Sequence, residues 1–90
     1  MASDSVLTLR SVETLQTARQ LLDRARSVAA ASSSVVVECS ALEQADASAM
    51  QVLLALRNAT GAKGGTIRVQ NVPAELAWRF DFAGLPYTTA

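Results

Sequence analysis

The sequence predicts an α/β domain whose elements alternate in the order β-α-β-α-β-α. Three short runs, at residues 5–10, 35–39 and 66–70, are rich in β-branched and other apolar residues, as strands are. Each run precedes a segment in which apolar residues recur at three- and four-residue spacing, which is typical of helices. This alternation favours a mixed or parallel sheet with right-handed crossovers. Since no internal repeat or linker interrupts the pattern, residues 1–90 are expected to form a single domain.

The first strand is expected at an edge of the sheet, and Ser11 is expected to cap the helix that follows it. That helix should be amphipathic and run for about four turns, until the serine-rich segment 30–34 ends it. Its apolar stripe consists of Val12, Leu15, Ala18, Leu22, Ala25 and Ala29.

The second strand, residues 35–39, is almost entirely apolar, and such a run suits an inner strand covered on at least one face. Asp46 is expected to cap a second helix over about residues 47–60, which a glycine-rich turn at 61–65 should end. The apolar stripe of this helix consists of Ala49, Val52, Leu53, Leu56 and Ala59, with Met50 and Leu54 at its margins.

The third strand, residues 66–70, alternates as a half-buried strand does. Pro73 lies where the first residue of a third helix is expected, and Gly84 is expected to cap its end. The apolar line of this helix consists of Leu76, Ala77, Phe80 and Ala83. Trp78 lies beside that line, so both core packing and partial exposure are open for it.

The charge pattern argues against several classes of partner. Eight basic and eight acidic residues give a net charge of zero, and the basic residues are scattered along the chain. The sequence therefore predicts no basic patch of the kind that binds nucleic acid or an anionic membrane. No apolar stretch approaches the roughly 20 residues that span a bilayer, and the N-terminus has no signal-peptide pattern. We therefore expect a cytoplasmic protein with protein partners, without nucleic-acid binding or membrane insertion.

The chain has little equipment for catalysis. It has no histidine and one cysteine, which excludes Ser–His and Cys–His pairs and histidine metal sites. Cys39 ends an apolar run, which favours a small buried residue over a reactive thiol. The sequence therefore predicts a protein that is not an enzyme, with no catalytic residue, metal site or cofactor.

Ser48 is the main functional lead. It lies in the first turn of the second predicted helix, where N–H groups lack partners and the helix dipole is positive. A phosphoryl group can be accommodated there, and adding one would strongly change a docking surface. A small polar residue is also common in a first helical turn without any function, so both readings stay open.

Several short motifs follow one another in a specific order: the apolar strand 35–39, Asp46-x-Ser48-Ala49, Val52-Leu53-Leu54, Gly64-Gly65, the strand 66–70, Pro73 and Gly84-Leu85. This order resembles the STAS domain, a family named after sulfate transporters and the antagonists of anti-sigma factors. The resemblance covers about residues 5–87. It implies a mixed sheet of about four strands with helices packed mainly on one face.

In regulatory members of that family, an Asp-Ser-Ser-Gly sequence opens the helix after the central strand. A partner kinase, which is also the anti-sigma factor, phosphorylates the second serine and thereby breaks the complex. The resemblance places Ser48 at that serine and Asp46 at the aspartate, while Ala47 and Ala49 replace the first serine and the glycine. The expected partner-binding residues around the phospho-acceptor Ser48 are Glu43, Gln44, Ala45, Asp46, Ala47, Ala49, Met50 and Gln51.

The expected function is thus a phospho-regulated protein-interaction domain whose partner is a serine kinase or anti-sigma factor. The alternative is a constitutive accessory subunit of a chemotaxis assembly or of a lipid-transport ATPase, as some STAS proteins are. The continuation Gln51-Val52-Leu53-Leu54-Ala55 looks like short STAS proteins of bacterial chemotaxis, so a chemotaxis component stays open as partner. Relatives carry a last helix that is missing here, which leaves the surface exposed or covered by a second chain, as in a homodimer.

Overall fold

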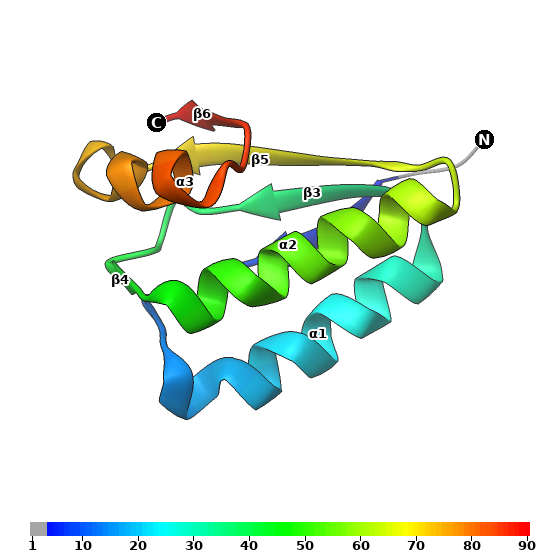
Figure 1. Cartoon of the computed structure of the whole chain (residues 1–90), viewed down its shortest axis with the longest axis horizontal. Coiled ribbons are helices and arrows are strands. Elements are labelled where there is room, and N and C mark those ends of the chain that lie inside the picture. The colour runs from blue at the N-terminus through cyan, green and yellow to red at the C-terminus, as the bar shows by residue number, and fades with distance from the viewer. Residues whose placement is uncertain (1–3) are drawn as a thin grey trace.

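A computed structural model describes residues 4–90. Its main sheet has four parallel strands in the order β1-β3-β5-β6, and α1 and α2 lie side by side against one face (Figure 1). These strands are β1 (Ser5–Thr8), β3 (Ser34–Glu38), β5 (Thr66–Val72) and β6 (Tyr87–Thr89). The predicted α/β fold with about four strands and helices mainly on one face is therefore confirmed.

Three helices connect the strands: α1 (Ala18–Ala31), α2 (Ala47–Ala62) and α3 (Ala77–Ala83). Short 3-10 turns lead into α1 and α3, namely η1 (Leu15–Thr17) and η2 (Ala74–Leu76). A second, two-stranded parallel sheet pairs β2 (Val12–Glu13) with β4 (Gln44–Ala45). This small sheet holds the start of α1 beside the start of α2, which is the end of the molecule where the candidate site lies.

The core lies between the sheet and the helices. Val35 and Val37 alternate with Val36 along β3, and only the first two belong to the main core cluster. From the helices, the fully buried Leu21, Leu53 and Phe80 pack against this layer. The middle helix predicted over 47–60 is confirmed and ends two residues later, at Ala62.

The start of the first helix differs from the prediction. Ser11 caps no helix, since the N-caps of η1 and α1 are Thr14 and Thr17. Its carbonyl oxygen instead accepts hydrogen bonds from the N–H groups of Glu43 and Gln44, at 2.8 and 2.9 Å. Val12 consequently lies in β2, and Leu15 lies in η1 with 68% of its surface exposed. Within the helix, the predicted Ala25 is buried and the predicted Leu22 and Ala29 are partly buried against the core. The prediction missed Leu21, which is fully buried.

Later elements show two smaller differences. Thr60, not Ala59, is buried in the last turns of α2, and its hydroxyl donates to the carbonyl oxygen of Leu56 at 3.1 Å. After Gly84, which ends α3 with a φ of 75° as predicted, the chain forms the unexpected strand β6. Three residues after a proline carry too little pattern to predict a strand.

An ion pair between the buried Glu13 and the partly exposed Arg24 joins β2 to α1. Glu13 is 1% exposed, and its Oε2 accepts from Arg24 Nη2 at 2.8 Å and from the Arg10 N–H at 2.7 Å. Arg24 also donates to the carbonyl oxygen of Thr8 at 2.9 Å. Because burying a charge without a partner is costly, these contacts hold the segment between β1 and β2 against α1. Among residues 4–90, no helix is both long and apolar enough to cross a membrane.

The core assignment predicts a large difference between two leucines. Leu53 is fully buried and Leu15 is 68% exposed. We expect Leu53→Ala to lower the free energy of unfolding by about 2–5 kcal/mol, because it leaves a cavity. Leu15→Ala, the matched control, should change it by less than about 0.5 kcal/mol. Urea denaturation of both variants measures this, and equal losses would contradict the assignment.

Candidate functional site

The candidate site lies where the chain leaves β3 and enters α2. Backbone hydrogen bonds fix this connection at both ends, because the Cys39 N–H donates to Gln70 and the Glu43 N–H donates to Ser11. Leu42 is 2% exposed and anchors the middle of the connection in the core. The start of α2 is therefore held at the carboxyl end of the sheet, which is a common place for functional groups in α/β folds.

Asp46 is the N-cap of α2, as the sequence predicts. Its Oδ1 accepts hydrogen bonds from the N–H groups of Ser48, at 2.9 Å, and Ala49, at 3.2 Å. Its Oδ2 accepts from the N–H of Leu15 at 2.9 Å. One carboxylate thus satisfies two free donors of the helix and one donor of η1, and so joins the two helix starts.

The environment of Asp46 favours its charged form. Burial raises its pKa, but hydrogen bonds from Leu15, Ala49 and Ser48 and the charge of Arg79 together outweigh that effect. The pKa of Asp46 therefore lies below its ordinary value. A negative charge is held at the positive end of the α2 dipole, next to the side chain of residue 48.

Ser48 lies in the first turn of α2 and is half-buried. Its N–H is bonded to Asp46, while its hydroxyl forms no hydrogen bond with any residue in 4–90. The side chain is thus neither part of the cap nor locked into the core. A hydroxyl in this place is available for a contact or a modification, provided that the incoming group tolerates the carboxylate beside it.

The surrounding residues divide by burial. Glu43, Gln44, Ala47 and Gln51 are exposed and surround Ser48 with polar and small groups. The side chains of three other residues expected to contact a partner point inward: Ala45 is 7%, Ala49 0% and Met50 3% exposed. Their methyl and thioether groups support the helix start from beneath, so none of the three belongs to the exposed rim around Ser48.

A polar cluster at the ends of β3 and β5 was not predicted from the sequence. Glu38 accepts from Gln70 Nε2 at 2.9 Å, from Asn71 Nδ2 at 3.0 Å and from the Ser40 N–H at 3.0 Å. Hydrogen bonds from Gln70, Asn71 and Ser40 outweigh desolvation and lower the pKa of Glu38 to about 2. Asn71 has a φ of 59°, a left-handed conformation that asparagine tolerates better than most residues. The cluster fixes the first residues of the connection that leads to Asp46.

Cys39 follows Glu38 and is fully buried. Burial, assisted by the charge of Glu38, raises the pKa of its thiol to about 12. A thiol that stays protonated is a poor nucleophile, so Cys39 acts as a small apolar core residue, as the sequence predicts.

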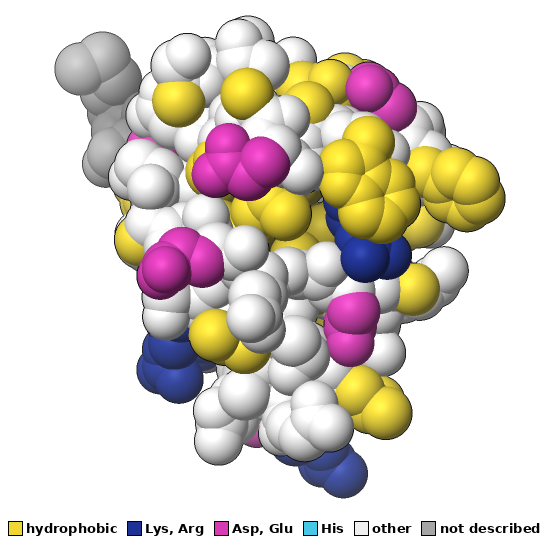
Figure 2. Space-filling model, turned by 90° about the vertical axis from the view of Figure 1, so that its left-hand side faces the viewer, with side chains coloured by type: hydrophobic (Ala, Val, Ile, Leu, Met, Phe, Trp, Pro, Cys, Tyr) yellow, Lys and Arg dark blue, Asp and Glu magenta, His cyan; other side chains and the backbone are white. Residues whose placement is uncertain are grey.

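Two aromatic residues of α3 are exposed on the same side of the molecule. Trp78 is 56% and Phe82 91% exposed, and the guanidinium of Arg79 lies 4.3 Å from the centre of the Trp78 ring. Figure 2 shows hydrophobic groups gathered around a basic side chain at this end of the molecule. The sequence alone does not decide the exposure of Trp78, because a position beside the apolar line of a short helix fits both a buried and an exposed side chain.

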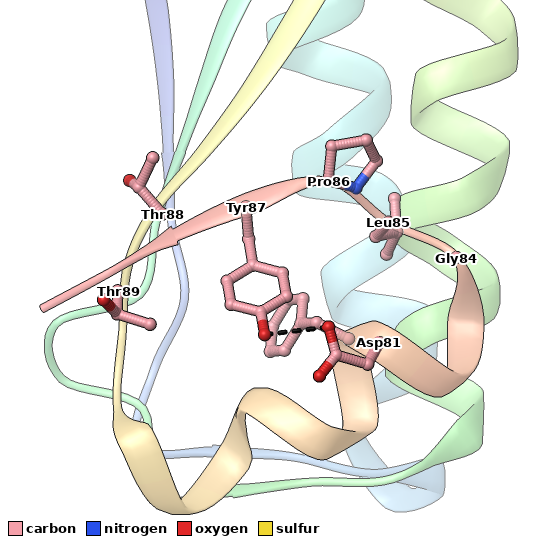
Figure 3. Close-up of a pocket in the computed structure, with 8 residues that line it drawn as sticks. Asp81, Gly84, Leu85, Pro86, Tyr87, Thr88 and Thr89 are labelled. Carbon is pink, nitrogen blue, oxygen red and sulfur yellow. Dashed lines mark hydrogen bonds between the residues drawn. The ribbon is translucent and has the colours of Figure 1, made fainter.

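A further hollow lies between α3 and β6 (Figure 3). Tyr87 donates its hydroxyl to Asp81 there at 2.8 Å, and its ring lies 5.8 Å from that of Phe80. The hydrogen bond to Asp81 raises the pKa of Tyr87. These contacts hold β6 against α3, so the residues around the hollow have a structural role.

The fold matches that of known proteins. The family model described as "Mlab, STAS domain" matches residues 2–86, so the chain belongs to the STAS family. Two solved structures of a Bacillus protein, SpoIIAA, share the fold. Its phosphorylated form matches with a TM-score of 0.76 and 18% identity, over 96% of this chain and 80% of that chain. Its unphosphorylated form, titled an anti-sigma factor antagonist, matches with a TM-score of 0.77 and 16% identity, over 100% and 84%. No protein among those with curated descriptions matches this chain.

The cap of α2 predicts a measurable stability loss. Asp46→Ala leaves three N–H groups without their acceptor and should lower the free energy of unfolding by about 1–2 kcal/mol. Asp46→Asn keeps an acceptor oxygen and should cost less. Urea denaturation gives the energies, and amide hydrogen exchange at Leu15, Ser48 and Ala49 localises the loss. The exposed Asp23→Ala is the control, and a loss as large as that of Asp46→Ala would contradict a role of the cap.

The Glu38 cluster predicts a pH dependence. Because folding lowers the pKa of Glu38 from 4.5 to about 2, its stabilising contribution is complete above pH 4.5 and is lost as the pH falls toward 2. The free energy of unfolding should therefore fall over this window, and the fall should be smaller in Glu38→Gln. Urea denaturation at several pH values measures both slopes. Glu75→Gln, at an exposed glutamate, should keep the wild-type slope, and an unchanged slope in Glu38→Gln would contradict the assignment.

Proposed function

We propose that this STAS domain is a regulatory, non-enzymatic protein-interaction domain whose switch is phosphorylation of Ser48. The observation that carries the proposal is the position of the Ser48 hydroxyl, in the first turn of α2 and without a hydrogen-bond partner among residues 4–90. The partner is a serine kinase that also acts as the regulated protein, of the anti-sigma factor class. The contact surface is formed by Ser48 with the exposed Glu43, Gln44, Ala47 and Gln51.

The local electrostatics support a switch that acts at the surface. A phosphoryl group adds about −1.5 to −2 charges at neutral pH. The two N–H groups at the start of α2 already donate to Asp46, so they are not free to bind the phosphate. The added charge would lie beside the charged Asp46 carboxylate and would repel an acidic or apolar partner. Binding would be lost while the fold is kept.

A protein of the same fold supports this reading. SpoIIAA has been solved in a phosphorylated and in an unphosphorylated form, and both forms match this chain with nearly the same TM-score. The fold therefore accommodates both states of that protein without a rearrangement large enough to change the match. A switch through surface charge needs no larger change than this.

One observation favours the second candidate, a constitutive accessory subunit in which Ser48 is a plain contact. The carboxylate that caps α2 is held charged close to residue 48, and it opposes the addition of a phosphate at that place. The assembly in that case is a chemotaxis complex or a lipid-transport ATPase. The two candidates predict different behaviour of the same two variants, so one experiment separates them.

The direct test is to incubate the chain with the serine kinases encoded beside its gene and to locate phosphate by mass spectrometry. We expect one modification, at Ser48, which Ser48→Ala abolishes. Ser27→Ala, at an exposed serine of α1, should leave the modification unchanged. If none of the kinases modifies Ser48, the proposal of a phosphorylation switch is wrong.

The affinities of Ser48 variants for the same kinases distinguish a phosphorylation switch from a constitutive subunit in which Ser48 is only a contact residue. For a switch, Ser48→Asp should weaken binding by at least about tenfold, while Ser48→Ala should retain it. Similar small losses for both variants would favour the constitutive subunit. Isothermal titration or surface plasmon resonance measures these affinities.

A further inference from the structure

The exposed aromatic residues of α3 form one ridge. Trp78 and Phe82 are four residues apart and therefore lie on the same side of the helix. Large apolar side chains this exposed are unusual outside interaction sites, and aromatic residues are the commonest binding anchors. Packing of the core therefore does not explain why these two aromatic residues are present.

A groove runs beside the ridge, between α2 and α3. Met50 and Leu54 line it from α2, Phe82 and Ala83 line it from α3, and its volume is about 310 Å³. Ala47 also lines the groove; it is the first residue of α2 and directly precedes Ser48. The groove therefore continues the proposed contact surface and does not form a separate face.

The groove is mostly apolar, with one amide side chain, that of Gln51, and a single charge. Arg79 is the only charged residue that lines it, and the Nε of this arginine is buried without a hydrogen-bond partner among residues 4–90. Its guanidinium lies over the Trp78 ring, and this cation–π contact restricts its position. Asp46, the nearby carboxylate, already accepts three N–H groups and leaves the guanidinium free to pair with an incoming acid.

We propose that this groove binds an amphipathic helix of the partner protein, with apolar residues seated between α2 and α3 and a carboxylate paired with Arg79. The match of an apolar trough with one cation selects an acidic helix over a basic one. A membrane is a poorer occupant, because anionic lipid attracts clusters of basic residues and only Arg79 lies here. The proposal rests on the proposed function and names the chemistry of the partner.

The test uses two synthetic peptides of about 18 residues, long enough to be helical, and the unphosphorylated full chain. Both carry leucines at positions i, i+3, i+4 and i+7, flanked by glutamates in one peptide and by lysines in the other. Trp78 is the only tryptophan, and its ring stacks against Arg79, which lines the groove, so its fluorescence serves as the readout. We expect the glutamate peptide to bind, with a blue shift of the emission, at least about tenfold more tightly than the lysine peptide.

Three variants locate the binding. Arg79→Gln should lower the affinity for the glutamate peptide by about tenfold and so remove the preference for it over the lysine peptide. Phe82→Ser should lower the affinity for both peptides by about tenfold or more. Val6→Ser, at an apolar residue of β1 that is 55% exposed, is the matched control and should change nothing. Circular dichroism establishes that all three variants are folded.

Four results would overturn the proposal: no binding of the glutamate peptide at about 1 mM, equal affinity for both peptides, binding to anionic vesicles in place of peptide, or a dimer in sedimentation that Phe82→Ser dissociates. The peptides need no kinase and no phosphate. If the peptides fail to bind, the proposal that Ser48 is phosphorylated is unaffected. If Ser48 is not phosphorylated, the proposal that the groove binds an acidic helix is unaffected.

Discussion

One carboxylate, that of Asp46, holds together the end of the molecule that carries the proposed site. It accepts two N–H groups of its own helix and one from Leu15, which is 31 residues away in the chain. The helix begins at the residue after it, so the direction in which Ser48 projects is set by this cap. The parallel pairing of β2 with β4 brings the two segments together, and the carboxylate then fixes their spacing.

The same cap decides what the site can do. In a helix start with free N–H groups, an anion would find ready donors. Here those donors are already used by a charged side chain, so a phosphate on Ser48 would gain little from the helix and would meet a like charge. The negative charge would therefore act outward, on whatever lies against the surface. Ala49 does not stand in the way of a partner, because its methyl group is fully buried.

Local patterns were enough to predict the features that depend on near neighbours in the chain. Asp46 caps a helix through residues two and three positions later, so its role is visible in the sequence. The Glu38 cluster joins residues 32 and 33 positions apart, and no local signal marks it. The misplaced start of the first helix has the same cause: the carbonyl oxygen of Ser11 is engaged by the N–H groups of Glu43 and Gln44, a contact that arises only once the sheet has formed. Helical spacing at Val12 and Leu15 was therefore overridden by tertiary pairing.

Arg79 connects the two surfaces of this end of the domain. Its charge lowers the pKa of Asp46, and the same side chain lines the groove between α2 and α3. A change of charge beside Asp46 therefore also changes the electrostatic potential in the groove. A phosphate at Ser48 would draw on the guanidinium that an acidic partner helix would otherwise use, because one cation cannot fully neutralise both. A domain with a single cation in this place can thus combine recognition and regulation without moving its backbone.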